Sequence, residues 1–535
     1  MRPRAGMLIA AGALVAGTVT VLPATATATA ATGTGPAARP LTPLTWTDCP
    51  TKAYPKLQCA TLKVPLNHDD PAGRSIALAL TRVAHTAKTF QGPLLVNPGG
   101  PGGSGRGLAG YVAAALPAKV AAQYDVIGFD PRGVGKSEPA LNCLPGHFDP
   151  VRPDSVPGGA DGERAGVERA QAFAKACGEK YADVLPYIDT VSTARDMDAI
   201  RAALGAPRLN YLGYSYGTYL GAVYARLHPE RVRRMALDSV VNPHGVWYED
   251  NLAQDYAFDT RHKDFAAWVA RNDDAYRLGT DPAAVEAAWY GMREELRTRP
   301  ASGKVGPGEL EDTFLPGGYY NGYWPKLAAA FSAYVNERDG APLVKAYEDF
   351  AASDAAAENG YSVYASVQCR DAAWPRDWNV WRKDNWDTHA KAPFSTWNNA
   401  WYNAPCAFWP VESLTPPDVT NDRLPPVLVL QATDDAATPY EGGVALHRMV
   451  RGSSLVVEEG GGNHGVTLAG NDCMDEHLAA YLSTGKVPRG TEGSEADAVC
   501  ETLPEPEPAK AKAKAARGNA ADAGATLHGM LGHVR

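Results

Sequence analysis

The sequence predicts an α/β fold, a mostly parallel central sheet flanked by helices, with a large and mainly helical cap inserted before the last strands. Short apolar runs typical of buried strands alternate with helical patterns on either side of residues 242–416. Within residues 242–416 the strand patterns disappear, and eleven of the twelve tryptophans lie between Trp247 and Trp409. We expect most of these rings to fill the core of the cap and a minority to face a substrate pocket.

Both ends of the 535-residue chain differ in composition from its middle. A basic start, an apolar stretch to Leu22 and the small residues that follow predict a signal peptide over residues 1–30, then a leader or propeptide over 31–44. The alternative is an uncleaved membrane anchor, which the Gly-, Ala- and Thr-rich run disfavours. Residues 501–535 are rich in Pro, Glu, Ala and Lys and predict a disordered tail. We therefore expect a secreted, extracellular protein with no membrane attachment after cleavage.

Composition and cysteine spacing exclude several classes of function. A net charge of −9 over the whole chain gives no basic footprint for nucleic acid. The eight cysteines lack C-x-x-C spacing and no H-E-x-x-H motif occurs, so we expect no metal and no cofactor. We also expect a monomer. In an oxidising compartment the simplest disulfides join sequence neighbours: Cys49–Cys59, Cys143–Cys177, Cys369–Cys406 and Cys473–Cys500.

The first part of the core, residues 45–241, opens with apolar alternation that predicts an antiparallel strand pair, 62–66 and 75–83, at a sheet edge. The next buried strand, 93–96, runs into the loop 97–105. So many glycines in one loop expose backbone N–H groups, which suits the binding of an oxyanion. A phosphate loop is the rival interpretation, but the required lysine and its spacing are missing. A second alternative is that this loop is a flexible turn without a chemical role.

Two further elements support this loop and the sheet. A strand over 124–129 ends at Asp130 and Arg132, which we expect to pair and to pin their loop near the glycines. A helix over 192–204 carries apolar residues on one side and is expected to pack on the sheet.

The pentapeptide Gly213-Tyr214-Ser215-Tyr216-Gly217 lies between a predicted buried strand, 209–212, and a predicted helix, 218–227. A serine between two glycines at a strand-to-helix turn is a nucleophile elbow. The glycines let neighbouring backbone pass closely, and the helix N-terminus lies behind the hydroxyl. Ser215 is therefore the candidate nucleophile.

The last part of the core, residues 417–500, supplies partners for a nucleophilic serine. A strand over 426–432 leads to Asp434 and Asp435, and a later strand leads to His464 in a glycine-flanked loop. A serine needs a base to take its proton, and the base needs an acid to orient it. The carboxyl ends of parallel strands meet at one edge, so these loops are expected to converge there. Either aspartate fits the acid role.

These motifs resemble those of the secreted tripeptidyl aminopeptidases of actinomycetes, in the proline-iminopeptidase branch of the α/β-hydrolases. The chain order of nucleophile, acid and base is also that of α/β-hydrolases. The resemblance spans roughly residues 45 to 500. The matching segments are residues 97–105, 130–137 without Lys136, 213–217, 435–439 and 461–465.

The resemblance implies hydrolysis of peptides from a free N-terminus through an acyl-enzyme. It assigns the acid to Asp435, since Asp434 stands at a position that is usually apolar in the family. The backbone N–H groups of Tyr216 and of Gly100 or its neighbour would hold the oxyanion.

An aminopeptidase also needs a carboxylate for the substrate ammonium. Glu249, Asp250 and Asp371 are the candidates, and the sequence does not rank them. The partners expected are peptides with a free N-terminus.

The same triad would also serve a prolyl or mono-aminoacyl aminopeptidase or a carboxylesterase. A binding protein with a catalytically inactive hydrolase fold is disfavoured because all three triad residue types are present. Epoxide hydrolase or dehalogenase chemistry would place an Asp at the position of Ser215.

Overall fold

The computed structural model describes residues 43–351, 354–490, 495–508 and 519–531. The expected signal peptide and nearly all of the expected leader lie outside these residues. Across the described part of the chain, no helix combines the length and apolar character needed to cross a membrane.

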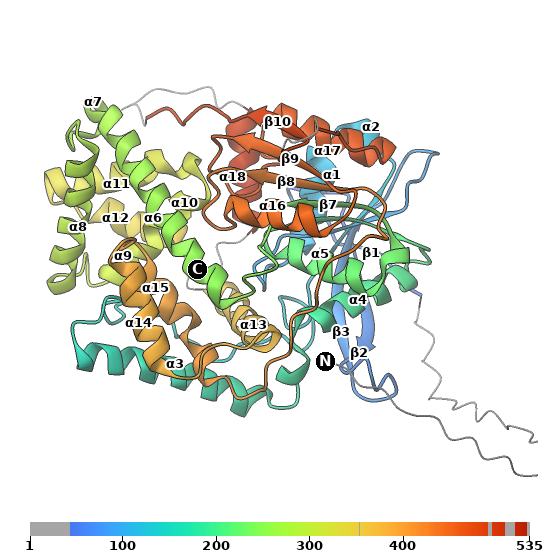
Figure 1. The fold of residues 1–535 in the computed structure, drawn as a ribbon, viewed down its shortest axis with the longest axis horizontal. Helices are drawn as coiled ribbons and strands as arrows, with labels where there is room; N and C mark the ends of the chain where they lie inside the picture. The colour runs from blue at the N-terminus through green and yellow to red at the C-terminus, as the bar shows by residue number, and fades with distance from the viewer. Residues whose placement is uncertain (1–42, 352–353, 491–494, 509–518, 532–535) are drawn as a thin grey trace, which may run out of the picture. The chain divides into compact units, whose positions relative to one another are not determined.

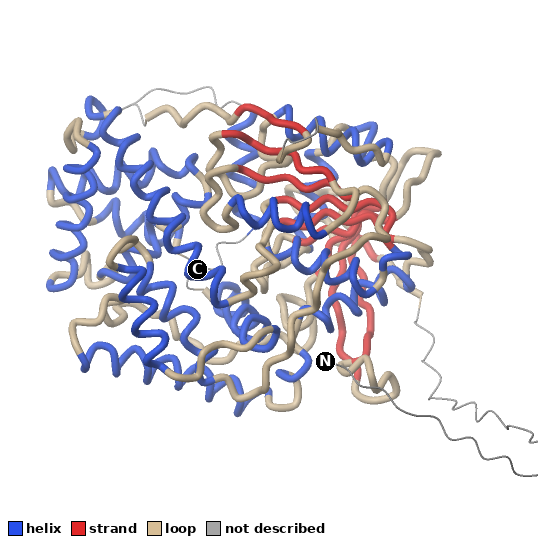
Figure 2. Tube along the Cα trace, in the orientation of Figure 1, coloured by secondary structure: helices blue, strands red, loops and turns tan. Residues whose placement is uncertain are grey.

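The core is built on one sheet of ten strands in the order β1-β2-β3-β5-β4-β6-β7-β8-β9-β10. The predicted antiparallel pair is confirmed by β2 and β3, and all pairings from β5 through β4 to β10 are parallel. Figures 1 and 2 show the strands side by side with helices around them. The strands are β1 (Thr47–Asp48), β2 (Gln58–Pro65), β3 (Ser75–Val83), β4 (Pro93–Asn97), β5 (Asp125–Phe129), β6 (Leu209–Tyr214), β7 (Val232–Asp238), β8 (Val427–Ala432), β9 (Ser454–Glu459) and β10 (Ala498–Glu501).

Helices cover both faces of the sheet because successive strand residues point to opposite sides. In β4, Leu95 packs in a cluster with residues of α4, α5 and α16, whereas Leu94 and Val96 pack in a cluster with residues of α1, α17 and α18. The central strands β4, β6 and β8 are buried on both faces, as their apolar runs predict. These helices are α1 (Arg106–Ala115), α2 (Ala118–Ala121), α4 (Thr190–Ala203), α5 (Tyr216–Leu227), α16 (Tyr440–Met449), α17 (Asp472–Thr484) and α18 (Asn519–Leu531), with the short turns η1 (Leu185–Tyr187) and η2 (Pro229–Arg231).

Between β7 and β8 the described chain is mainly helical. Tyr361, Trp381 and Tyr402 pack in the cluster that includes the sheet, whereas Trp268, Trp289 and Trp324 are buried in a second hydrophobic core, formed mainly by the earlier of these helices. The helices between β7 and β8 are α6 (Tyr248–Arg271), α7 (Asp273–Tyr276), α8 (Pro282–Thr298), α9 (Pro307–Phe314), α10 (Pro316–Tyr319), η3 (Asn321–Tyr323), α11 (Trp324–Glu337), α12 (Ala341–Phe350), α13 (Ala355–Asp371), α14 (Trp378–His389), α15 (Thr396–Asn403) and η4 (Ala404–Phe408). We call residues 242–416 the cap. The helix α3 (Ala160–Tyr181), which precedes the cap in the chain, packs against η4.

All four predicted disulfides are confirmed: Cys49–Cys59, Cys143–Cys177, Cys369–Cys406 and Cys473–Cys500. Each bridge closes a segment between sequence neighbours, which limits the freedom of the unfolded chain.

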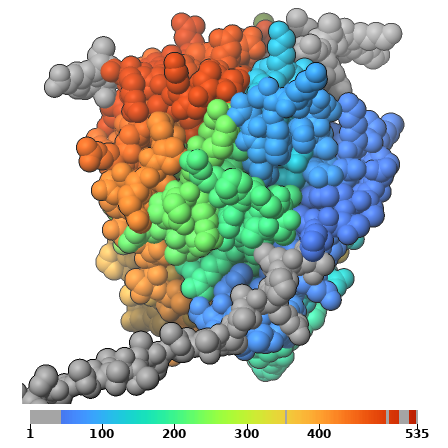
Figure 3. Space-filling model, turned by 90° about the vertical axis from the view of Figure 1, so that its right-hand side faces the viewer, coloured from blue at the N-terminus to red at the C-terminus, as the bar shows by residue number. Residues whose placement is uncertain are grey.

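Figure 3 shows one face on which the early segments, in blue and green, lie against the late segments, in orange and red.

Two expectations differ from the structure. Arg132 does not pair with Asp130. Its guanidinium donates to Asp196 of α4 at 2.7 and 2.8 Å, while Asp130 accepts from Ser104 at 2.5 Å and from the backbone N–H of Lys136 at 2.8 Å. The fully buried Asp196 offers two oxygens to the guanidinium fork, a geometry that sequence proximity does not reveal.

The second difference concerns the tail. Residues 519–531, which we expected to be disordered, form α18, and Leu527 and Leu531 are buried in the core beside the sheet. These leucines are spaced i, i+4 and therefore share one helix face. The Ala- and Gly-rich composition around them concealed this short apolar face.

Candidate active site

Ser215 is the residue between β6 and α5, and its backbone is held in an unfavourable conformation. Its φ is 57° and its ψ is −129°, a region in which a non-glycine residue is strained by about 1–3 kcal/mol. The backbone N–H of Ser215 donates to the carbonyl of Asp238 on β7 at 3.0 Å, which anchors the turn to the neighbouring strand. The side chain therefore projects from the sheet edge at the N-terminus of α5.

Glycines around this turn are required by close approaches. A Cβ on Gly217 would lie 2.8 Å from Oδ1 of Asn97, and a Cβ on Gly213 would lie 2.5 Å from the carbonyl oxygen of Gly217. In the glycine loop, Gly99 has a φ of +96°, and a Cβ there would lie 2.8 Å from the Cβ of Ser215. The glycine loop thus packs directly on the elbow, as the oxyanion interpretation requires.

The imidazole of His464 meets a carboxylate at the end of β8. Its Nδ1 lies 2.9 Å from Oδ2 and 3.1 Å from Oδ1 of Asp435. Both side chains are 2% exposed or less. In contrast, Asp434 is exposed, so only Asp435 is placed to orient the ring.

Thr438 is a member of this group whose role sequence reasoning missed. Its Oγ1 donates to Oδ2 of Asp435 at 2.9 Å and lies 3.3 Å from Nδ1 of His464. The backbone N–H groups of Ala437 and Thr438 donate to Oδ1 of Asp435 at 2.9 and 3.0 Å. The Asp-x-x-Thr spacing is the signal that could have indicated this turn, because Asp side chains commonly bond the backbone two or three residues ahead.

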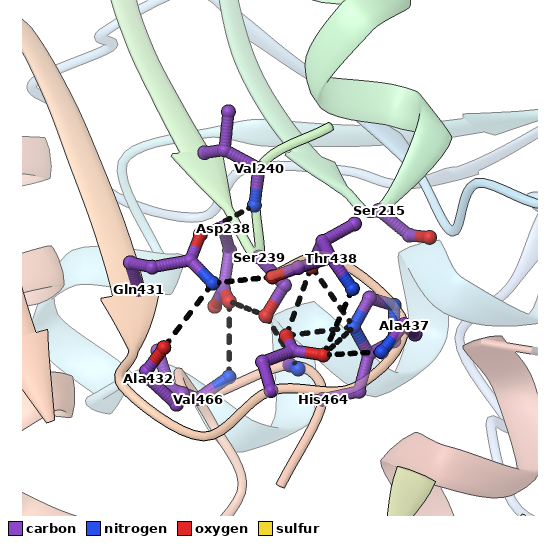
Figure 4. A network of polar contacts seen from close by, with 12 residues as sticks. Ser215, Asp238, Ser239, Val240, Gln431, Ala432, Ala437, Thr438, His464 and Val466 are labelled. Carbon is purple, nitrogen blue, oxygen red and sulfur yellow. Dashed lines mark hydrogen bonds and ion pairs between the residues drawn. The ribbon is translucent and has the colours of Figure 1, made fainter. Parts of the chain in front are cut away.

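A cavity of about 310 Å³ lies over Ser215, between the sheet edge and the cap. Tyr319, whose ring meets that of His464 edge to face at 5.5 Å, lines the same cavity, so His464 lies next to it. Figure 4 shows the side chains of Ser215, Thr438 and His464 in one close view. The proposed oxyanion residues Gly100 and Tyr216 line the cavity, as does one tryptophan of the cap, Trp247. Other lining residues are Ser215, Asp250, Gln254, Tyr319 and Thr438.

Of the candidate ammonium ligands, only Asp250 lines the cavity. Its Oδ2 is buried and has no hydrogen-bond partner among the described residues. Burial, and next the charge of Glu249, raise the pKa of Asp250 to about 8. Glu249 itself is exposed.

Asp371 lies elsewhere and serves the elbow. Its carboxylate accepts from the N–H and the hydroxyl of Thr190 at 2.8 and 2.5 Å, and that hydroxyl lies 2.7 Å from the Tyr216 hydroxyl. Burial, and next the charge of Asp189, raise the pKa of Asp371 to about 7.

Two other carboxylates line the cavity and were not among our candidates. Asp312 is buried but already pairs with Arg152 and accepts from Asn398 at 3.0 Å, and Glu441 is exposed.

Within the described residues, one group has the spacing of metal ligands, Cys473, His477 and Cys500, but its two cysteines are joined as a disulfide. Disulfide sulfurs are not the thiolates that bind metals.

The chain is similar to known hydrolases over most of its length. Residues 92–468 match the model of the alpha/beta hydrolase fold family. The tripeptidyl aminopeptidase of Streptomyces lividans is 46% identical over 456 residues, which cover 83% of this chain and 85% of that protein.

Two mycobacterial proteins are more distant relatives. The serine protease Hip1 of Mycobacterium tuberculosis is 34% identical over 83% of this chain and 90% of its own length. Carboxylesterase B of the same organism is 34% identical over 91% of this chain and 97% of its own length.

Proposed function

Because the chain belongs to the α/β-hydrolase fold family, with tripeptidyl aminopeptidase and serine protease relatives over most of its length, we propose that it is a secreted serine exopeptidase that releases tripeptides from free N-termini. The catalytic residues are Ser215, His464 and Asp435. The peptide class of the substrate and the release of three residues follow from the similarity to the Streptomyces enzyme.

The observation that carries the exopeptidase proposal is the carboxylate of Asp250. It lines the same cavity as Ser215, and its Oδ2 is buried and has no hydrogen-bond partner among the described residues. A buried carboxylate without a partner is costly, and a substrate ammonium would supply both the charge and the hydrogen bonds that it lacks. An endopeptidase or an esterase has no use for such a group, because its substrates present no charged amine at that place.

The geometry supports the following chemistry. Oγ of Ser215 attacks the scissile carbonyl carbon while Nε2 of His464 takes the hydroxyl proton, and Nδ1–H of His464 donates to Asp435. The backbone N–H groups of Gly100 and Tyr216 stabilise the oxyanion. His464 then gives the proton to the amine nitrogen as the C–N bond breaks, which leaves a tripeptidyl ester on Ser215. Water, activated by His464, hydrolyses this ester and releases the tripeptide.

Secretion is part of the proposal. The basic, apolar and small-residue segments at the start of the chain are those of an export signal, and four disulfides form in the folded protein. The mature protein would then act on peptides outside the cell, without a membrane anchor.

A carboxylesterase is the second candidate, favoured by the 34% identity to carboxylesterase B. Initial rates should therefore be compared on a free tripeptide anilide, its N-acetylated form, a single-residue anilide and a short acyl ester, with Ser215→Ala as the control. We expect cleavage of the free tripeptide anilide alone. Preferred cleavage of the ester, or of the single-residue anilide, would overturn the substrate assignment while leaving the triad in place.

A further inference from the structure

Two buried side chains at the end of β7 bind the loop that carries His464. Figure 4 shows Asp238 and Ser239 beside that loop. The N–H of Gly465 donates to Oγ of Ser239 at 2.7 Å. The next two N–H groups, of Val466 and Thr467, donate to Oδ1 and Oδ2 of Asp238 at 2.9 and 2.8 Å. The amides of the three residues that directly follow His464 are therefore all held by one dipeptide.

The same dipeptide is fixed to the strands on both of its sides. The carbonyl of Asp238 accepts from the N–H of Ser215, and the N–H of Ser239 donates to the carbonyl of Leu430 on β8 at 2.9 Å. β7 lies between β6, which carries Ser215, and β8, which leads to Asp435. Asp238 and Ser239 thus connect the Ser215 turn and the loop after His464 with β8, the strand that leads to Asp435.

This arrangement lowers the stability of the fold. Asp238 and Ser239 are fully buried, and Ser239 has a positive φ of 60°. No cation is paired with Asp238 among the described residues, and its hydrogen bonds come from Thr467, Val466 and Ser239. A buried carboxylate that no cation neutralises costs stability, even when it is hydrogen-bonded. Burial accordingly raises the pKa of Asp238, although these hydrogen bonds lower it in part.

We propose that Asp238 and Ser239 are positioning residues that hold the His464 imidazole in register with Ser215 and Asp435. They act on His464 through the backbone of residues 465–467 and do not touch the substrate cavity. The inference rests on the proposed triad. A catalytic ring displaced by about 1 Å can lose about 10²-fold in rate, which is the scale of the effect expected here.

The test is the pair of variants Asp238→Asn and Ser239→Ala. An asparagine would present an NH₂ group to backbone N–H donors, so the loop after His464 would shift. We expect kcat per folded molecule to fall about 10²-fold in Asp238→Asn with KM unchanged, because the cavity walls remain. Ser239→Ala removes the acceptor of one loop amide and one donor to Asp238, and it should lower kcat less. Asp198→Asn, which loses ion pairs to Arg201 and Arg231 outside the lining of the cavity, is the matched control with normal kcat.

The rate of inactivation by a fluorophosphonate should fall in parallel with kcat, because that reaction also needs the base but no particular peptide. If the wild-type protein reacts with the fluorophosphonate but does not cleave the tripeptide anilide, the proposed substrate fails and this inference is still decided by the inactivation rates. Normal kcat or normal inactivation per folded molecule in both variants would overturn it and leave a purely structural role. If Asp238→Asn does not fold, the same readouts on Ser239→Ala decide.

Discussion

The two walls of the cavity over Ser215 are built on opposite principles. On the sheet side, the carboxylate of Asp435 receives hydrogen bonds from Ala437, Thr438 and His464, and both of its oxygens are satisfied. On the cap side, Oδ2 of Asp250 is equally buried but lacks a partner. Groups that perform the chemistry are fixed before the substrate arrives, which lowers the cost of reorganisation. Under the proposed function, the substrate ammonium supplies the partner that Asp250 lacks.

The largest effect should come from the sheet side. Replacing Ser215 or His464 by Ala is expected to lower kcat by about 10⁶-fold, and the double variant should be no worse than either single variant, because the two residues act as one unit. Single-turnover rates on the tripeptide anilide would measure this. Additive losses in the double variant would show that the two residues do not share a step.

On the cap side, Asp250→Asn should lower kcat/KM for a free tripeptide anilide by about 10²–10³-fold, the range for removing one partner of a buried charge pair. The amide keeps the shape but loses the charge that attracts the ammonium. Any slow cleavage of the N-acetylated substrate should be unchanged, and so should all rates of Glu249→Gln, whose side chain is exposed. An equal loss on both substrates would place Asp250 in the catalytic step and erase the difference between the two walls.

Thr438→Val should have a smaller effect, a fall in kcat of about tenfold, since a hydrogen bond to a charged group is worth about 1.5–3 kcal/mol. The variant keeps the shape of the side chain but removes the hydroxyl that donates to Asp435. Thr438→Ser retains the hydroxyl and should retain most of the activity. The readout is kcat on the tripeptide anilide, and a serine variant as impaired as the valine variant would contradict the prediction.

The last expected effect is a gain in stability rather than a loss of rate. The pKa of Asp250 is about 8 in the folded protein and near 4 in the unfolded chain, so between these values the unfolded chain releases a proton that the folded protein keeps. Asp250 therefore lowers the free energy of unfolding increasingly from about pH 4 to about pH 8. Asp250→Asn removes this cost, so its melting temperature should exceed that of the wild type at pH 8 and the difference should shrink towards pH 4. A difference independent of pH would mean that Asp250 is ionised throughout.

The fold was predicted from short sequence patterns, each of which indicates one strand or one helix. The apolar run before Gly213 and the helical pattern after Tyr216 indicate a strand and a helix without any knowledge of their neighbours, and β6 and α5 occupy those places. Cysteines close in sequence meet in space because each pair closes a short segment. The helix α18 was missed because its apolar face is short and is stabilised only by packing on the core.

By itself, the sequence determined the α/β class of the fold, the disulfide pairs and the candidates Ser215, Asp434, Asp435 and His464, because each follows from residues that are neighbours in the chain. The tertiary structure shows that Asp435 is the aspartate that contacts His464, and that Asp250 is the one of Glu249, Asp250 and Asp371 that lines the cavity. These placements depend on segments far away in sequence. It also revealed the hydrogen bonds of Thr438, Asp238 and Ser239. Their hydrogen bonds join loops that only the packing of β7, β8 and β9 brings together.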